Sequence, residues 1–131
     1  DTMIATDTAR WLLSMVPAQS AYALALAAFE AAQRAAEALK AERGVDYTKA
    51  DTEEAINAMA EIEGECDRVA GVLAAERALR AAEQKLIAWG IGRACAMSPE
   101  NAATLRDLQS RADRNVVARN RLVDLCFRFA A

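Results

Sequence analysis

Alanine is the feature of this sequence that most restricts what the chain can fold into. The chain has 131 residues, and 33 of them are alanine, the strongest helix former. Residues that disfavour helices are few: there are 5 Gly, 2 Pro and 18 β-branched residues, counted as 7 Val, 5 Ile and 6 Thr. We therefore expect an all-α protein.

The overall composition is typical of a soluble globular protein. Hydrophobic residues make up 54% of the chain and charged residues 27%, which suits a buried core under a solvated surface. A net charge of −3 gives no bulk attraction to nucleic acid or to acidic membranes. The longest uncharged apolar run, Ala21 to Phe29, is far shorter than the ~20 residues of a membrane span, and the residues after Asp1 do not resemble a signal sequence. We expect a single cytoplasmic domain over residues 1–131 that binds neither nucleic acid nor membrane.

The first predicted helix runs from Ala18 to Arg43, because Gly44 is placed as a C-terminal stop. Asp7 is a suitable N-cap for a shorter helical segment before it, and Pro17 kinks or restarts the helix between the two.

A second predicted helix begins at Asp51, which forms a capping-box-like start with Glu54. It runs to Trp89, and Gly90 and Gly92 end it.

The third predicted helix has a strong start signal, with Ser98 as N-cap and Pro99 at the first helical position, and it reaches Phe129. Short connections make neighbouring helices antiparallel. The sequence thus predicts an antiparallel bundle of three long helices, the first kinked near Pro17.

Two faces of the second predicted helix differ in character. The larger apolar residues recur at three-and-four spacing and form a core-facing stripe: Ala55, Met59, Ile62, Cys66, Val69 and Leu73. The opposite face carries small residues: Ala60, Gly64, Gly71, Ala75, Ala78 and Ala82. Each glycine costs a helix interior ~1 kcal/mol relative to alanine, so we expect another helix to approach this face, either in the same chain or across a dimer interface. Since alanine is common throughout the chain, a face made of it is also compatible with no special role.

The apolar arc of the first predicted helix is wider than the ~100° that a surface helix needs. A chain of three helices has too few partners to cover it on both sides. We therefore expect a homodimer to complete the bundle.

Arginines on the third predicted helix offer an alternative function. Arg114, Arg121 and Arg128 are seven residues apart and favour binding of an anionic small molecule. Asp107 and Asp124 lie at ion-pairing distance along the same helix, so intrahelical pairs are the competing explanation.

The chain has no histidine, which excludes histidine-based catalytic triads and the usual zinc sites. An acidic stretch from Asp51 to Asp67 holds seven carboxylates, of which Glu54, Glu61 and Glu65 share a face suited to Mg²⁺ or Mn²⁺. A solvated face near a helix start explains the stretch better, so we expect no metal and no cofactor.

The three cysteines form no CxxC pair, and we expect free thiols. Cys66 and Cys126 lie among apolar residues and are predicted to be buried, whereas Cys95 should be the first thiol that a reagent reaches.

Six aromatic residues are predicted to gather at one end of the bundle as core caps: Trp11, Tyr22, Phe29, Trp89, Phe127 and Phe129. The competing interpretation is a small apolar ligand pocket rimmed by Arg10, Arg93 or Arg128.

Taken together, these patterns favour a non-enzymatic helical interaction or assembly protein that forms a homodimer, with an unidentified protein partner as a further option. The alternative is a small-molecule-binding or catalytic bundle that uses the arginines of the third helix.

Overall fold

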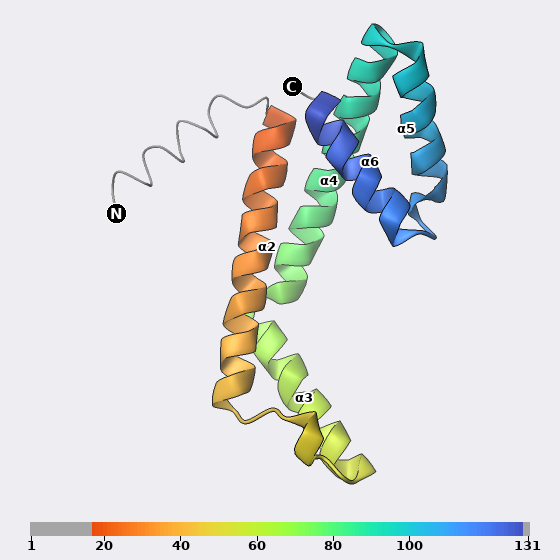
Figure 1. Ribbon diagram of the computed structural model, residues 1–131. Helices are drawn as coiled ribbons and strands as arrows, with labels where there is room; N and C mark the ends of the chain where they lie inside the picture. The colour runs from red at the N-terminus through yellow and green to blue at the C-terminus, as the bar shows by residue number, and fades with distance from the viewer. Residues whose placement is uncertain (1–16, 130–131) are drawn as a thin grey trace, which may run out of the picture. The chain divides into compact units, whose positions relative to one another are not determined.

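Helices account for nearly all of the part of the chain that the structure describes. The computed structural model describes residues 17–129, and within them it is all-helical, as predicted (Figure 1). The helices are α2 (Pro17–Glu42), the short 3₁₀ helix η1 (Tyr47–Lys49), α3 (Glu53–Ala70), α4 (Val72–Met97), α5 (Pro99–Ala112) and α6 (Val116–Phe129). The segment expected before Pro17, with Asp7, Arg10 and Trp11, lies outside the described residues.

Glycine and capping side chains set several of these helix ends as predicted. After α2, Gly44 takes a φ of 71°, the left-handed conformation that suits a glycine beyond a helix end. Ser98 accepts a hydrogen bond from the Asn101 amide at its Oγ atom, and Pro99 stands in the first turn of α5. The start of α3 is one residue later than predicted, because Thr52 rather than Asp51 is the N-cap and accepts a hydrogen bond from the Ala55 amide.

The second predicted helix is two helices. Gly71 adopts a φ of 74° and ends α3, and its N–H donates to the carbonyl oxygen of Arg68. The chain then enters α4 directly, since the Ala75 amide already donates to the Gly71 carbonyl. α4 continues through Gly90 and Gly92, which were expected to end it.

The third predicted helix also divides. α5 ends at Ala112, and the Asn115 side chain accepts hydrogen bonds from the amides of Val117 and Ala118 to start α6. An N-capping side chain and the turn before it therefore replace the continuous helix that the periodicity favoured.

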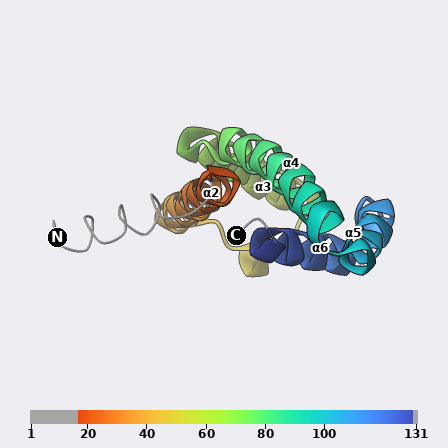
Figure 2. The ribbon, with the colours of Figure 1, turned by 90° about the horizontal axis from the view of Figure 1, so that it is seen from above.

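The described residues form two compact units. Unit 1 contains residues 17–24 and 80–129, and unit 2 contains residues 25–79. In unit 1, α5 and α6 pack at the C-terminal end of α4 (Figure 2). The core of unit 1 consists of Leu86, Ile87, Ala94, Ala102, Leu105, Leu108, Ala118, Leu122, Val123 and Cys126.

Gly90 lies where α4 and α6 pack closely in unit 1. A Cβ atom at this position would lie 2.6 Å from the Cβ atom and 2.7 Å from the Cα atom of Cys126 on α6. A glycine is needed here because any side chain would collide with the α6 backbone. The prediction that Gly90 stops a helix is thus wrong, and its role is to let two helices meet.

The start of α2 is joined to the core of unit 1 by two specific contacts. The buried Gln19 amide donates to the Phe127 carbonyl oxygen at 2.5 Å. Tyr22 meets the Phe127 ring edge-on, with ring centroids 6.0 Å apart.

In unit 2 the last turns of α3 lie beside the end of α2, and the first turns of α4 continue along α2 (Figure 1). The buried apolar side chains of unit 2 are few and mostly small: Ala32, Ala36, Cys66 and Leu79. Charged side chains supply much of the remaining contact between α2 and α3, as described next.

Candidate functional site

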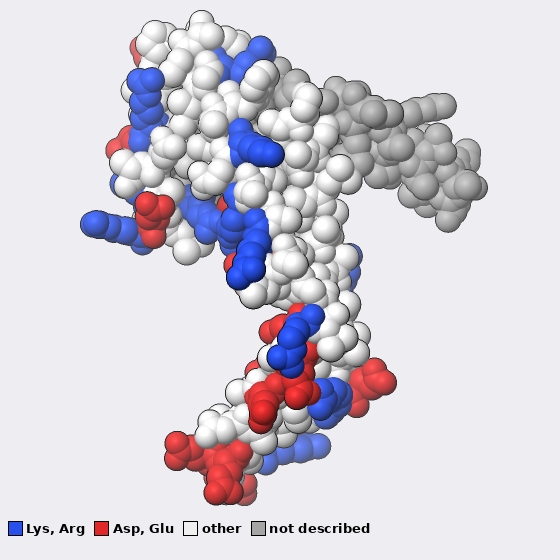
Figure 3. All heavy atoms as spheres, turned by 180° about the vertical axis from the view of Figure 1, so that it is seen from behind, with Lys and Arg blue, Asp and Glu red and all other residues white. Residues whose placement is uncertain are grey.

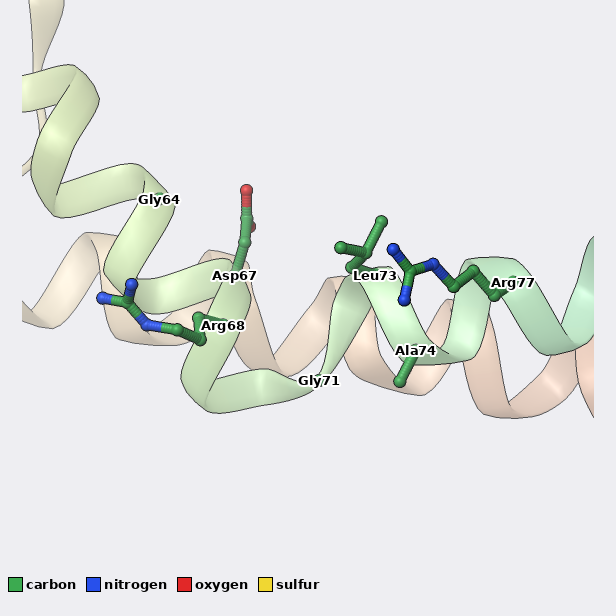
Figure 4. Close-up of a pocket in the computed structure, with 7 residues that line it drawn as sticks. All are labelled: Gly64, Asp67, Arg68, Gly71, Leu73, Ala74 and Arg77. Atoms are coloured by element: carbon green, nitrogen blue, oxygen red, sulfur yellow. The ribbon is translucent and has the colours of Figure 1, made fainter.

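An open groove lies where α3 and α4 meet (Figure 4). Its volume is about 450 Å³, and it is lined by Gly64, Asp67, Arg68, Gly71, Leu73, Ala74 and Arg77. The last two turns of α3 and the first turns of α4 supply these residues, so the whole groove belongs to unit 2.

Two glycines form the floor of the groove. Gly71 is required by the left-handed backbone at the bend, and Gly64 lies within α3. A Cβ atom built on either glycine would meet no neighbouring atom within 4 Å in the described residues. The helix expected to approach these glycines therefore does not come from the described part of this chain.

The wall of the groove on α4 is apolar and ends in a cation. Leu73 is 58% exposed, and it points to the same side as Asp67, with the Arg77 guanidinium group beside it (Figure 4). Arg77 forms no ion pair with any residue from 17 to 129. A large exposed apolar side chain next to an unpaired cation is an arrangement suited to a protein contact.

The predicted small-residue face is divided by the bend at Gly71. Ala60, Gly64 and Ala78 are exposed, Gly71 and Ala75 are half-buried, and Ala82 is buried within the chain itself. Because the register of side chains restarts after Gly71, Leu73 moves from the predicted core stripe to the open groove. Val69 lies before the bend and is 75% exposed, so the predicted core stripe is wrong at this position of α3 as well. Gly71 is the residue at which the side-chain pattern of α3 ends and that of α4 begins.

A network of charges joins α3 to α2. The Lys40 ammonium group lies 3.0 Å from Asp67, 3.2 Å from Glu37 and 3.7 Å from Glu63. Tyr47 donates a hydrogen bond to Glu63, which raises the pKa of the tyrosine.

A second ion pair extends this network, with the Arg43 guanidinium group 2.6 Å from Glu65. The Arg43 contact lowers the pKa of the Glu65 carboxyl group.

These carboxylates raise the pKa of Lys40, chiefly through its hydrogen bond with Asp67. The lysine therefore stays protonated at neutral pH. A second hollow of about 420 Å³ beside it is lined by Gln33, Ala36, Glu37, Lys40, Asp67 and Val72. We assign the Lys40 network to holding α3 against α2.

The acidic stretch gives no metal centre in residues 17–129, since no group of three or more acidic or cysteine ligands converges there. Glu63 and Asp67 pair with Lys40 of α2, and Glu65 pairs with Arg43 in the turn that follows α2. Glu54 and Glu61 are exposed on α3.

The structure does not place the three predicted anion-binding arginines on one helix. Arg114 lies in the turn between α5 and α6, whereas Arg121 and Arg128 are exposed on α6. Arg128 pairs with Asp124 at 3.0 Å, as the spacing predicted.

Arg119, which lies near the three arginines singled out from the sequence but is not one of them, contacts a buried carboxylate of unit 1. Arg119 lies 2.5 Å from the buried carboxylate of Glu83, which Arg80 also contacts at 2.7 Å.

The aromatic residues are distributed more widely than expected. Phe127 and Phe129 pack against the core of unit 1, but Trp89 is 48% exposed. Phe29 belongs to unit 2.

The three cysteines are free thiols, and their burial is as predicted. Cys66 and Cys126 are buried, and burial raises the pKa of the Cys126 thiol to about 11. Cys95 is exposed on α4, rather than in a connection, and its sulfur accepts a hydrogen bond from Arg106 at 3.1 Å.

No helix among the described residues combines the length and the apolarity needed to cross a membrane. In comparisons with known proteins, no protein-family model, no curated protein and no solved structure matches this chain.

Proposed function

We propose that this protein is a non-enzymatic helical interaction and assembly protein that forms a homodimeric bundle. The observation that carries the proposal is the small apolar core of unit 2. Two of its four buried apolar side chains are alanines, whereas Ile56, Val69 and Leu73 are 46%, 75% and 58% exposed.

The end of α3 and the first turns of α4 cover one face of α2, and the opposite faces of these helices stay exposed. Helices of this kind obtain most of their stability from tertiary packing of an apolar face and little from helix propensity alone. A second copy of the chain supplies the missing surface economically, because a symmetric dimer covers the same patch on both chains at once.

The chemistry of unit 2 supports binding over catalysis. Its most enclosed cation, Lys40, is held in the protonated state by carboxylates on α2 and α3. We place the assembly in the cytoplasm, where buried free thiols such as Cys66 and Cys126 remain reduced.

Analytical ultracentrifugation of the full chain at concentrations from about 1 to 100 µM tests the proposal, because a dimer with a micromolar Kd changes its mass across this range. We expect twice the 14.1 kDa mass of one chain at the upper end. A mass of one chain at every concentration would overturn the homodimer.

A further inference from the structure

We propose that the groove at the α3–α4 bend is where the second copy docks, with α3 of one chain lying antiparallel to α4 of its partner. This inference rests on the homodimer proposed above and identifies its interface. Three properties of unit 2 support it: the distribution of charge along the chain, the small residues of the groove floor, and the unpaired charges at its rim.

Charge changes sign at the end of α3. Seven carboxylates and no basic residue lie between Asp51 and Asp67, and acidic side chains gather at the end of unit 2 where α3 begins (Figure 3). The next charged residue is Arg68, and α4 then carries the half-buried Glu76 followed by the exposed Arg77. A surface with an acidic half and a basic half is complementary to a copy of itself turned by a two-fold axis near the bend.

Glu61 and Arg77 are two exposed charges that such an axis would pair. Glu61 lies on the groove side of α3, three residues before Gly64, and it is exposed. Neither Glu61 nor Arg77 forms an ion pair within residues 17–129. Antiparallel pairing of α3 with α4 brings Arg77 opposite the partner's Glu61, and the symmetry repeats this contact.

The groove floor allows the helices to come close. With no Cβ atom at Gly64 and only a methyl group at Ala74, a helix backbone can approach this surface closely. Leu73 then has a place against the small residues of the other chain, which buries a side chain that is 58% exposed in the single chain.

Two single charge reversals test the pairing. In an R77E dimer, two carboxylates oppose each other at both symmetry-related contacts, and in an E61R dimer two guanidinium groups do so. We expect each variant alone to dimerise at least tenfold more weakly than the wild type, because like charges are opposed at both contacts. In an equimolar mixture, the R77E chain and the E61R chain should form a heterodimer more readily than either forms a homodimer. Both contacts of this heterodimer join a carboxylate to a guanidinium group, because one chain carries Glu at positions 61 and 77 and the other carries Arg at both, so the mixture restores the pairs.

The double variant R77E/E61R supplies a second rescue, within a homodimer. Both contacts of its homodimer again join opposite charges, with the two signs exchanged between α3 and α4. We expect this double variant to dimerise with an affinity within about threefold of the wild type, which is the signature of a direct pair and not of two independent effects.

The controls are R34E and E42R, which reverse exposed charges of α2 outside the groove. They should leave the dimer unchanged, and circular dichroism checks that all five variants keep the helical fold.

If the wild type dimerises but R77E and E61R associate as tightly as R34E and E42R, the groove is not the interface although the homodimer stands. The same conclusion follows if the two single reversals weaken the dimer and the double variant restores nothing. If the wild type stays a monomer, the homodimer and its interface both fail.

Discussion

The two units of this protein use different forces to hold their helices together. In unit 1, α4, α5 and α6 enclose a continuous apolar cluster whose largest members, Leu86, Leu105 and Leu122, are 0–1% exposed. In unit 2, contact between α2 and α3 relies on small buried side chains and on the ion pairs of Lys40 and Arg43. Alanine makes helices in both units, but only the placement of larger side chains makes a core.

This difference has an energetic consequence. Full burial of a leucine side chain is worth about 1.5–3 kcal/mol, whereas an exposed ion pair is worth about 0–1 kcal/mol. We therefore expect unit 2 to open at a lower free energy than unit 1, so that the two behave as separate cooperative units.

The largest expected effect comes from removing a core side chain of unit 1. Leu86→Ala should lower the free energy of unfolding by about 2–5 kcal/mol, because Leu86 is fully buried and its removal leaves a cavity. Val69→Ala in unit 2 should change it by less than about 0.5 kcal/mol, since Val69 is 75% exposed. Urea unfolding of the two variants makes the comparison. Equal losses would mean that Val69 is covered in solution.

Alkaline pH should weaken unit 1 through one thiol. Burial raises the pKa of Cys126 from about 9 to about 11 in the folded chain, so between these values the unfolded chain loses this proton and the folded chain keeps it. Stability is therefore full below pH 9 and falls as the pH rises towards 11, by about 2–3 kcal/mol from this group. Urea unfolding at several pH values should show a steeper loss for wild type than for C126A.

C95A is the matched control for this experiment, because Cys95 is exposed. The C95A variant should retain the wild-type loss of stability. A C126A profile parallel to the wild type would show that the Cys126 thiol does not resist ionisation in the folded chain.

Two glycines of α4 allow a substitution at a crowded position to be compared with the same substitution at an open position of one helix. Gly90→Ala places a methyl group 2.6 Å from the Cys126 Cβ atom and should destabilise the protein by about 1–3 kcal/mol. Gly92→Ala meets no atom within 4 Å and should stabilise it by up to about 1 kcal/mol, since alanine favours the helix. Thermal unfolding of both variants decides the matter, and a neutral Gly90→Ala would contradict the close packing of α4 on α6.

These glycines also show how far the sequence could predict the fold. Helix content, the stop at Gly44 and the start at Ser98 follow from local conformational preferences, and all three are confirmed. The neighbouring sequence does not show whether a glycine within a long helical pattern ends the helix or lies where another helix packs against it. Gly71 breaks a helix, while Gly90 lets two helices cross, and the difference depends on packing partners far along the chain.

The candidate site was predictable to a similar extent. Gly64 and Gly71 were identified as neighbours on an unusual face, and the structure places both in one groove. Leu73 was assigned to the core because a continuous helix was assumed across Gly71. Once the bend is known, the side-chain register of α4 follows, and with it the exposure of Leu73 and Arg77.

The smallest effect concerns the ion pairs of unit 2, and it needs a local measurement. Lys40→Met removes the cation that joins α2 to Asp67 and Glu63, at a cost of about 1 kcal/mol. That loss should appear as an approximately fivefold faster alkylation of the buried Cys66 in the native protein, because the thiol is reached when unit 2 opens. Cys126 in unit 1 should react at its wild-type rate.

In the wild type, Cys95 should react first, then Cys66, and Cys126 last, as measured by mass spectrometry of timed samples. Lys85→Met is the matched control, because Lys85 is exposed in unit 1 and forms no ion pair within residues 17–129. It should leave the labelling of Cys66 unchanged. Equal acceleration of Cys66 and Cys126 by Lys40→Met would show that the two units open together, and the distinction between them would then describe packing but not stability.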